Sequence, residues 1–280
     1  MLIKKREDQV KGAWRYIFLL SIFSLIIVIP YAWLVARAFT TNTGEFTLSN
    51  WSFMWKETPY FRGLVLPVVW KSFGLSLLFA SGTAILMLAL TIPTAYAISR
   101  TKFPGRPLLT KLMIILDAFP TVALLIGFFY VLNAFGLMNS YFGVILIKVG
   151  MSLPGTIWLM KSFFDHVPWE LEWAAIVDGA TRFKTFTKII IPVVKPGAAV
   201  ILINSFLSGW GEYILLNLFI IGKSTTMSTF IGMTLNNEGK IAVPFGILAA
   251  ASLLYVIPVV ILFSISQKTL LSVQQGGIKN

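Results

Sequence analysis

The feature that most constrains this chain is a series of about six apolar runs, each long enough to cross a lipid bilayer. A membrane-spanning helix needs roughly 20 consecutive, mainly apolar residues. The runs lie near Trp14–Ala38, Ser72–Ala97, Leu112–Ala134, Phe142–Met160, Gly197–Ile221 and Val243–Ser266. They predict an all-α integral membrane protein with six transmembrane helices.

The composition excludes several classes of protein. With 57% hydrophobic and 12% charged residues and a mean hydropathy of +0.82, the chain lacks the polar surface that a soluble domain of 280 residues needs. Cysteine is absent and His166 is the single histidine, so no disulfide framework, thiolate nucleophile or Cys- or His-rich metal centre can form. The acidic residues are too scattered for a catalytic cluster. We expect no catalytic residue, no metal site and no enzyme activity.

The positive charge predicts an orientation in the membrane. If both termini are cytoplasmic, most of the 23 Lys and Arg residues fall in cytoplasmic segments, as the positive-inside tendency requires. The net charge of +12 is then explained by topology and lipid contact, and no nucleic-acid partner is expected. The first run is too long for the apolar core of a signal peptide, so we expect it to be retained.

These spans divide the chain into five parts. They are a cytoplasmic tail (1–13), the first transmembrane helix (14–38), an external segment (39–71), a core of five helices (72–266) and a cytoplasmic C-terminal tail (267–280). The core includes a long cytoplasmic loop at 161–196. The external segment is rich in aromatic residues, which are typical of the membrane interface; contact with a partner is the alternative.

The stretch "PWELEWAAIVDGA" within this loop predicts a short amphipathic helix. Pro168 suits a first-turn position, and Glu170 and Glu172 favour a helix N-terminus. One face carries the positions Trp169, Trp173, Ile176 and Ala180. Gly179 lies where a helix C-terminus favours a left-handed residue.

A second short helix is predicted directly afterwards. Thr181 can cap it, and Phe183, Phe186 and Ile190 share one face before the chain continues through Pro192 into the next span. Two apolar stripes outside the bilayer must be covered. They either dock on another protein or lie flat on the membrane surface.

The same loop resembles the "EAA loop" of the transmembrane subunits of binding-protein-dependent ABC importers. That pattern reads Glu-Ala-Ala, three residues, Gly, nine residues, Ile, one residue, Leu-Pro. This chain matches it at Ala174, Ala175, Gly179 and Ile189 and, with Ile191 in place of Leu, at Pro192. It departs at the glutamate position, which is Trp173, with Glu172 one place earlier. A glutamate shifted by one place points about 100° further round the helix.

Further stretches extend the resemblance to maltose-type sugar permeases. They are "AYAISRTKFPGR" (Ala95–Arg106), "WGEY" (Trp210–Tyr213) and the ending "GGIK" (Gly276–Lys279). Together with the loop they cover the chain from about residue 70 to its end. The resemblance implies a type I ABC importer permease fold in the cytoplasmic membrane of a bacterium or archaeon, transporting an oligosaccharide or related sugar.

The resemblance also implies partners. They are a second permease subunit, a cytoplasmic ATPase dimer that carries ATP and Mg, and an external substrate-binding protein. No cofactor is expected on this chain. Residues 168–180 would act as a coupling helix on the ATPase. The residues expected to dock are Glu172, Trp173, Ala174, Ala175, Asp178, Gly179, Ala180 and Pro192. Gly276, Gly277 and Lys279 would either touch the ATPase or form a frayed end.

Four polar residues inside the apolar runs are candidates for the translocation path, because ionisable groups in a membrane are often functional. Glu212 would line the path, meet the binding protein, or hydrogen-bond a neighbouring helix. Asp117 would line the path or reach the cytoplasmic interface. Lys148 needs a partner or a watery cavity, and Asn204, like Asn217, would contact sugar hydroxyls or bond between helices.

Other functions remain open on the sequence. An ABC importer for a non-sugar solute would show the same loop, and a secondary transporter would need internal repeats, which are absent. "GKST" at Gly222–Thr225 lacks the earlier glycine of a phosphate-binding loop, and "GWGEYI" lacks the third glycine of a dinucleotide fingerprint. No nucleotide site is therefore expected on this chain.

Overall fold

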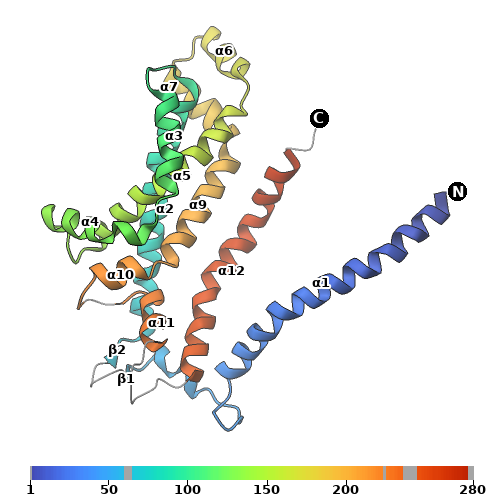
Figure 1. Cartoon of the computed structure of the whole chain (residues 1–280), viewed down its shortest axis with the longest axis vertical. Helices are drawn as coiled ribbons and strands as arrows, with labels where there is room; N and C mark the ends of the chain where they lie inside the picture. The colour runs from blue at the N-terminus through green and yellow to red at the C-terminus, as the bar shows by residue number, and fades with distance from the viewer. Residues whose placement is uncertain (1, 60–64, 223–224, 236–244, 277–280) are drawn as a thin grey trace. The chain divides into compact units, whose positions relative to one another are not determined.

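The computed structural model describes residues 2–59, 65–222, 225–235 and 245–276, and within them the protein is helical apart from one short pair of strands (Figure 1). The chain forms two compact units, one of residues 1–69 and 233–256 and the other of residues 70–232 and 257–280. Four helices are long and apolar enough to cross a membrane, or up to six when two bent helix pairs count as one span each. The prediction of an all-α membrane protein is confirmed.

The first unit contains helix α1 (Leu2–Ala38), a 3-10 turn (Ser49–Met54) and the strands β1 (Thr58–Pro59) and β2 (Val65–Leu66). The strands pair antiparallel. Helix α1 begins at Leu2, so residues 2–13 of the predicted tail are helical and continuous with the first candidate span, Tyr16–Ala38. Residues 39–59, part of the segment predicted to be external, are ordered by the buried side chain of Asn50, whose amide donates hydrogen bonds to the carbonyls of Arg37, Ala38 and Thr40 at 3.0–3.3 Å.

The second unit is built around helix α5 (Tyr141–Asp165), which packs against α3 (Arg106–Asp117), α4 (Thr121–Ala134), α9 (Lys195–Trp210) and α10 (Ile214–Phe219). Helix α2 (Val69–Arg100) runs beside them in Figure 1. The contacts are close at Gly209 of α9, where an added Cβ would lie 2.9 Å from the Cα of Ala80 in α2. Buried apolar side chains of these helices form one core.

Two predicted spans are wrong in detail, and prolines or glycines explain both. The run Leu112–Ala134 is broken into α3 and α4, which meet at 102°. Pro120 caps α4, lacks an N–H and disfavours helical backbone at the residue before it. The run Gly197–Ile221 is also broken, because α9 ends before Gly211 and α10 is a separate short helix.

The last described segments are α11 (Met227–Leu235) and α12 (Phe245–Gly276). Helix α12 continues to Gly276, through most of the predicted C-terminal tail. Residues Gly277 and Lys279, predicted to reach the ATPase, lie outside the described residues.

Candidate functional site

The loop 161–196, predicted to be cytoplasmic, contains two short helices, as its pattern predicted. Helix α6 (Trp169–Val177) starts after Pro168, and α7 (Arg182–Thr185) starts after Thr181, whose hydroxyl accepts a hydrogen bond from the Lys184 N–H at 3.3 Å. Gly179 has φ +85°, in the left-handed region where glycine carries no Cβ penalty. Its N–H donates to the Ile176 carbonyl, so it ends α6 as a C-terminal cap.

The chain after α7 leads into the membrane region through a bend. A π-helical turn (Phe186–Ile190) and α8 (Ile191–Val193) continue the helix, which meets α9 at 73°. Pro192 and Pro196 flank this bend, and each removes a backbone donor. The loop and α9 are therefore joined by a short bend of defined geometry.

Helix α6 exposes an apolar surface. The side chains of Trp173 and Val177 are 61% and 85% exposed, and Trp169, Leu171 and Ile176 are also exposed. We call these five residues the α6 surface. Among the other residues predicted to dock, Ala174, Asp178, Gly179 and Pro192 are exposed and Ala180 is half-buried.

Two of the predicted docking residues are turned inward instead. Glu172 and Ala175 are buried, so their side chains are not available at the α6 surface. The two positions are three residues apart and share one side of the helix. The shift of the glutamate by one place thus puts its carboxylate against the body of the second unit.

The buried carboxylate of Glu172 meets Arg100 at the end of α2. The Arg100 Nε lies 2.8 Å from Glu172 Oε1, with the two side chains 4% and 8% exposed. The contact is an ion pair without a hydrogen bond, because the Nε–H is not aimed at that oxygen. The hydroxyl of Tyr96 lies 3.5 Å from the other carboxylate oxygen.

Arg100 also binds the chain that links α5 to α6. Its Nη2 donates to the carbonyls of Phe164 (2.9 Å) and Val167 (2.6 Å), and its guanidinium lies 4.5 Å from the ring centre of Trp169. We call this set of contacts, with Glu172, the Arg100 clasp. It fixes α6 to both α2 and α5. Arg100 was not among the predicted site residues, although it is a cation at the end of an apolar run and lies in the stretch Ala95–Arg106.

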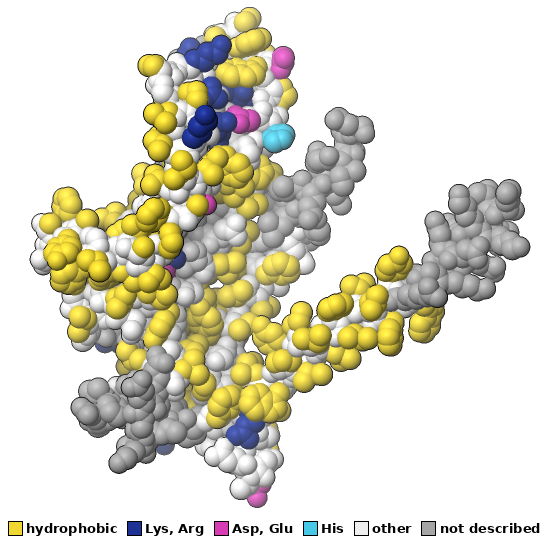
Figure 2. Space-filling model, in the orientation of Figure 1, with side chains coloured by type: hydrophobic (Ala, Val, Ile, Leu, Met, Phe, Trp, Pro, Cys, Tyr) yellow, Lys and Arg dark blue, Asp and Glu magenta, His cyan; other side chains and the backbone are white. Residues whose placement is uncertain are grey.

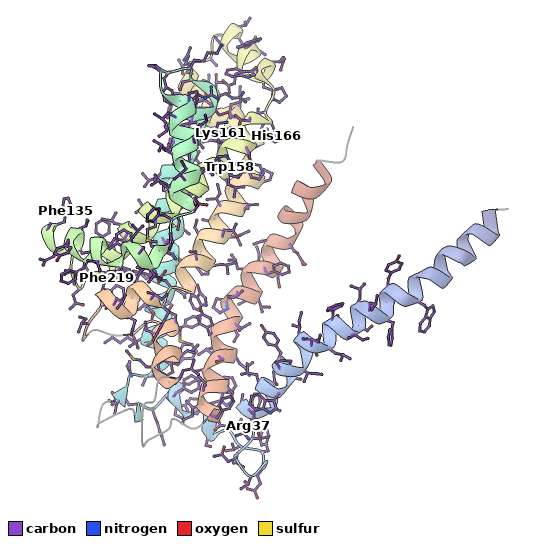
Figure 3. The ribbon with its side chains drawn as sticks, viewed as in Figure 1. Arg37, Phe135, Trp158, Lys161, His166 and Phe219 are labelled. Carbon is purple, nitrogen blue, oxygen red and sulfur yellow. The ribbon has the colours of Figure 1, made fainter. Side chains whose placement is uncertain are left out.

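Basic side chains gather at the same end of the second unit. In Figure 2, Lys and Arg concentrate near α6 and α7, whereas apolar side chains cover the middle of the bundle. Trp158 and Lys161 of α5, and His166 directly after this helix, lie towards this end (Figure 3). Lys161 forms an ion pair with Asp165, which also accepts a hydrogen bond from the Ser99 hydroxyl at 2.6 Å.

A second candidate site is a cavity of about 680 Å³ between α2, α3, α4, α5 and α9. All four predicted path residues line it: Asp117, Lys148, Asn204 and Glu212. Asn217 does not. The volume is within the range of roughly 300–1,000 Å³ typical of small-molecule pockets.

Lys148 and Glu212 form an ion pair in this cavity. The Lys148 Nζ lies 2.6 Å from Glu212 Oε2, and the side chains are 17% and 9% exposed. Glu212 Oε1 accepts a hydrogen bond from the Leu215 N–H at 2.9 Å in the first turn of α10. Glu212 was predicted to lie inside a span. In the structure it lies in the turn after α9. It therefore connects α5 to the start of α10 as well as lining the cavity.

Asp117 lies where the broken span turns. It is the last residue of α3, and its carboxylate rests on Gly155 of α5: an added Cβ there would lie 2.2 Å from Asp117 Oδ1. The bend at Pro120 leaves Asp117 on the cavity lining, which favours the translocation-path alternative; its relation to the cytoplasmic interface stays a prediction.

Comparison with known proteins gives consistent matches over most of the chain. Residues 90–271 match the family described as "Binding-protein-dependent transport system inner membrane component". The chain is 31% identical over 272 residues to the galactooligosaccharides transport system permease protein GanQ of Bacillus subtilis, covering 93% of each chain. It is 29% identical over 268 residues to the diacetylchitobiose uptake system permease protein NgcG of Streptomyces coelicolor, covering 93% of this chain and 87% of that one.

A solved structure shares the fold. One chain in the crystal structure of a bacterial ABC transporter involved in the import of the acidic polysaccharide alginate matches with a TM-score of 0.77 and 20% identity. The match covers 94% of this chain and 97% of that chain. The helical arrangement is thus one already known in an ABC transporter.

Proposed function

Because the chain belongs to the family of inner membrane components of binding-protein-dependent transport systems, we propose that it is the permease subunit of an ATP-driven ABC importer for an oligosaccharide or related sugar. It is a multi-pass membrane protein. Relatives named for galactooligosaccharide, diacetylchitobiose and maltodextrin transport support the sugar class. The cavity beside α5 supports it too, because hydroxyl and amide side chains line it together with Trp158.

The proposed orientation has six spans and both termini in the cytoplasm. Counting each bent pair as one span gives six. The gathering of Lys and Arg near α6 and α7 (Figure 2) favours a cytoplasmic position for that end. The membrane would be the cytoplasmic membrane of a bacterium or archaeon.

The observation that carries the coupling proposal is the α6 surface, an exposed apolar patch on a helix whose other side is fixed by the Arg100 clasp. We assign it to a cytoplasmic ATPase dimer, which would hold ATP and Mg, since this chain has no nucleotide-binding motif. Closure of the dimer would move α6. The Arg100 clasp would pass that movement to α2 and α5 as one rigid body, and the cavity would open to the outside.

The proposed assembly includes two further partners. A second permease subunit would complete the translocation path, and an external binding protein would deliver the sugar. The alternative of an amphipathic hairpin lying on lipid is less consistent with Glu172 and Ala175, which pack against protein. An ABC importer for a non-sugar solute would keep the same coupling, and only the ligand of the binding protein separates the two.

The test is affinity purification of the tagged chain in mild detergent, with identification of the co-purifying proteins. We expect a soluble ATPase and a second permease with the unchanged chain, and loss of the ATPase with Gly179→Asp. Aspartate tolerates left-handed backbone better than most residues and would meet nothing within 4 Å at its Cβ, so the main effect is a charge at the docking surface.

The matched control is Gly44→Asp. Gly44 has φ +89° and equally open surroundings but lies in the segment between α1 and α2. Loss of the ATPase in both variants, or its retention in Gly179→Asp, would contradict docking at α6. Recovery of the unchanged chain as a lone oligomer would favour a secondary transporter.

A further inference from the structure

The cavity beside α5 contains one carboxylate that its surroundings do not neutralise. The ionisable residues among the described lining are Asp117, Lys148 and Glu212. Lys148 and Glu212 neutralise each other at 2.6 Å. Asp117 is exposed and makes no hydrogen bond or ion pair with any residue that the structure describes. The cavity wall therefore carries a single uncompensated negative charge.

The position of that charge is built into the packing of α3 on α5. Both oxygens and the Cγ of Asp117 lie within 2.8 Å of the point where a Cβ on Gly155 would stand. Only glycine leaves this space, so the carboxylate is seated against the α5 backbone. The bend after Asp117 keeps the residue at the cavity instead of carrying it onward along a straight span.

The rest of the lining is neutral and rich in hydrogen-bonding groups. Six hydroxyl side chains and one amide face the cavity: Thr83, Thr121, Ser152, Thr156, Ser205, Ser208 and Asn204. Trp158 adds an aromatic ring that is 50% exposed. Such a surface suits a polyhydroxylated solute with apolar C–H faces, and it provides no free cation to balance an acid.

We propose that this cavity accepts uncharged saccharides and that Asp117 excludes anionic ones. The proposal rests on the proposed function and narrows its substrate class. A carboxylate accepts hydrogen bonds from sugar hydroxyls. A uronate or sulfonate group would instead meet a like charge in a cavity where screening by water is weaker than in bulk, and Lys148 is already held by Glu212.

The chain has no cysteine, so a single thiol can report the potential at Asp117. Ser152→Cys places one on the cavity lining, three residues before Gly155 and hence about one helical turn from the carboxylate. The complex purified through the tagged chain is treated at low salt with a cationic (trimethylammonium) or an anionic (sulfonate) ethyl methanethiosulfonate. Modification of this chain is followed by loss of a maleimide-PEG gel shift.

The measured quantity is the cationic-to-anionic rate ratio, divided by the same ratio for a free thiol. A unit charge about 8 Å away changes the local concentration of a monovalent ion by roughly 2- to 30-fold, for a dielectric constant between about 80 and 20. The two reagents respond in opposite directions. We therefore expect Asp117→Asn to lower the ratio at least about fivefold, and Glu170→Gln, outside the cavity, to leave it unchanged.

A second measurement compares two probes, maltotriose and trigalacturonate, as protectants of the same thiol. Slower labelling with maltotriose than with trigalacturonate supports the proposal. Equal effects of the two trisaccharides, a larger effect of the acid, or a ratio that does not respond to Asp117→Asn would overturn it. These readouts need no ATP hydrolysis. Failure of the proposed function appears separately, as the absence of an ATPase from the purified complex.

Discussion

Removing the cation of the Arg100 clasp should release α6 from the bundle. Arg100→Met leaves the Glu172 carboxylate, which is 8% exposed, without its ion-pair partner. Breaking one side of a buried ion pair costs about 3–5 kcal/mol. The carbonyls of Phe164 and Val167 lose their shared donor as well. Taking about 3 kcal/mol as a lower bound, local opening of residues 164–177 becomes roughly 100-fold more frequent.

Hydrogen–deuterium exchange of the detergent-solubilised complex measures this opening directly. We expect peptides from 164–177 to exchange about 100-fold faster in Arg100→Met. The control is Lys161→Met, which breaks the more exposed pair with Asp165 and should change exchange by less than about tenfold, since such pairs contribute about 0–1 kcal/mol.

The double variant Arg100→Met with Glu172→Met separates the ion pair from the rest of the clasp. Replacing both charges by apolar side chains is often nearly neutral, so much of the protection should return. The reasoning would be refuted if Arg100→Met exchanged no faster than Lys161→Met. It would also fail if the double variant opened as readily as Arg100→Met alone.

Three further changes test other parts of the structure. Gly155→Ala should push the Asp117 carboxylate off α5 with little effect on thermal stability, because the added Cβ meets only the end of an exposed side chain, and it should lower the cationic-to-anionic labelling ratio at Ser152→Cys; an unaltered ratio would contradict the packing. Glu212→Gln should leave the half-buried Lys148 ammonium without a counter-ion and lower the melting temperature of the complex, by less than the roughly 3–5 kcal/mol of a fully buried pair because both side chains line a cavity, whereas no change would mean that the pair is not formed. Asn50→Ala removes two N–H donors that three carbonyls share, at about 0.5–1.5 kcal/mol per donor, and should raise protease sensitivity in the segment 39–59 without affecting exchange at α6.

Local rules predicted the loop well because its signals are short in range. The apolar spacing and acidic first turn of α6, the left-handed Gly179 and the Thr181 cap all act within a few residues and are found in the structure. The motifs also led to the family, which the comparisons confirm. Which side of α6 is buried was harder to predict from the sequence, because Trp173 and Glu172 occupy adjacent positions and either could have faced the protein.

The broken spans show where hydropathy is insufficient. A run of apolar residues predicts that a segment enters the membrane but not that it stays straight, and Pro120 was not weighed as a break. That single bend decides the role of Asp117. On a straight helix it would be one acidic residue near an interface, whereas the bend seats it on Gly155 beside the cavity.

The sequence by itself determined the class of protein, the approximate spans, the two-helix loop and four polar residues that line the cavity. Hydropathy and capping depend on neighbours along the chain, so one sequence is enough to read them. Only the tertiary structure decided the partners of those residues. The ion pairs Arg100–Glu172 and Lys148–Glu212 join residues far apart in sequence, and so does the close approach of the exposed Asp117 to Gly155. From the sequence, a charge in an apolar run indicates only that a counter-ion is needed. Which residue provides that counter-ion depends on how the helices pack.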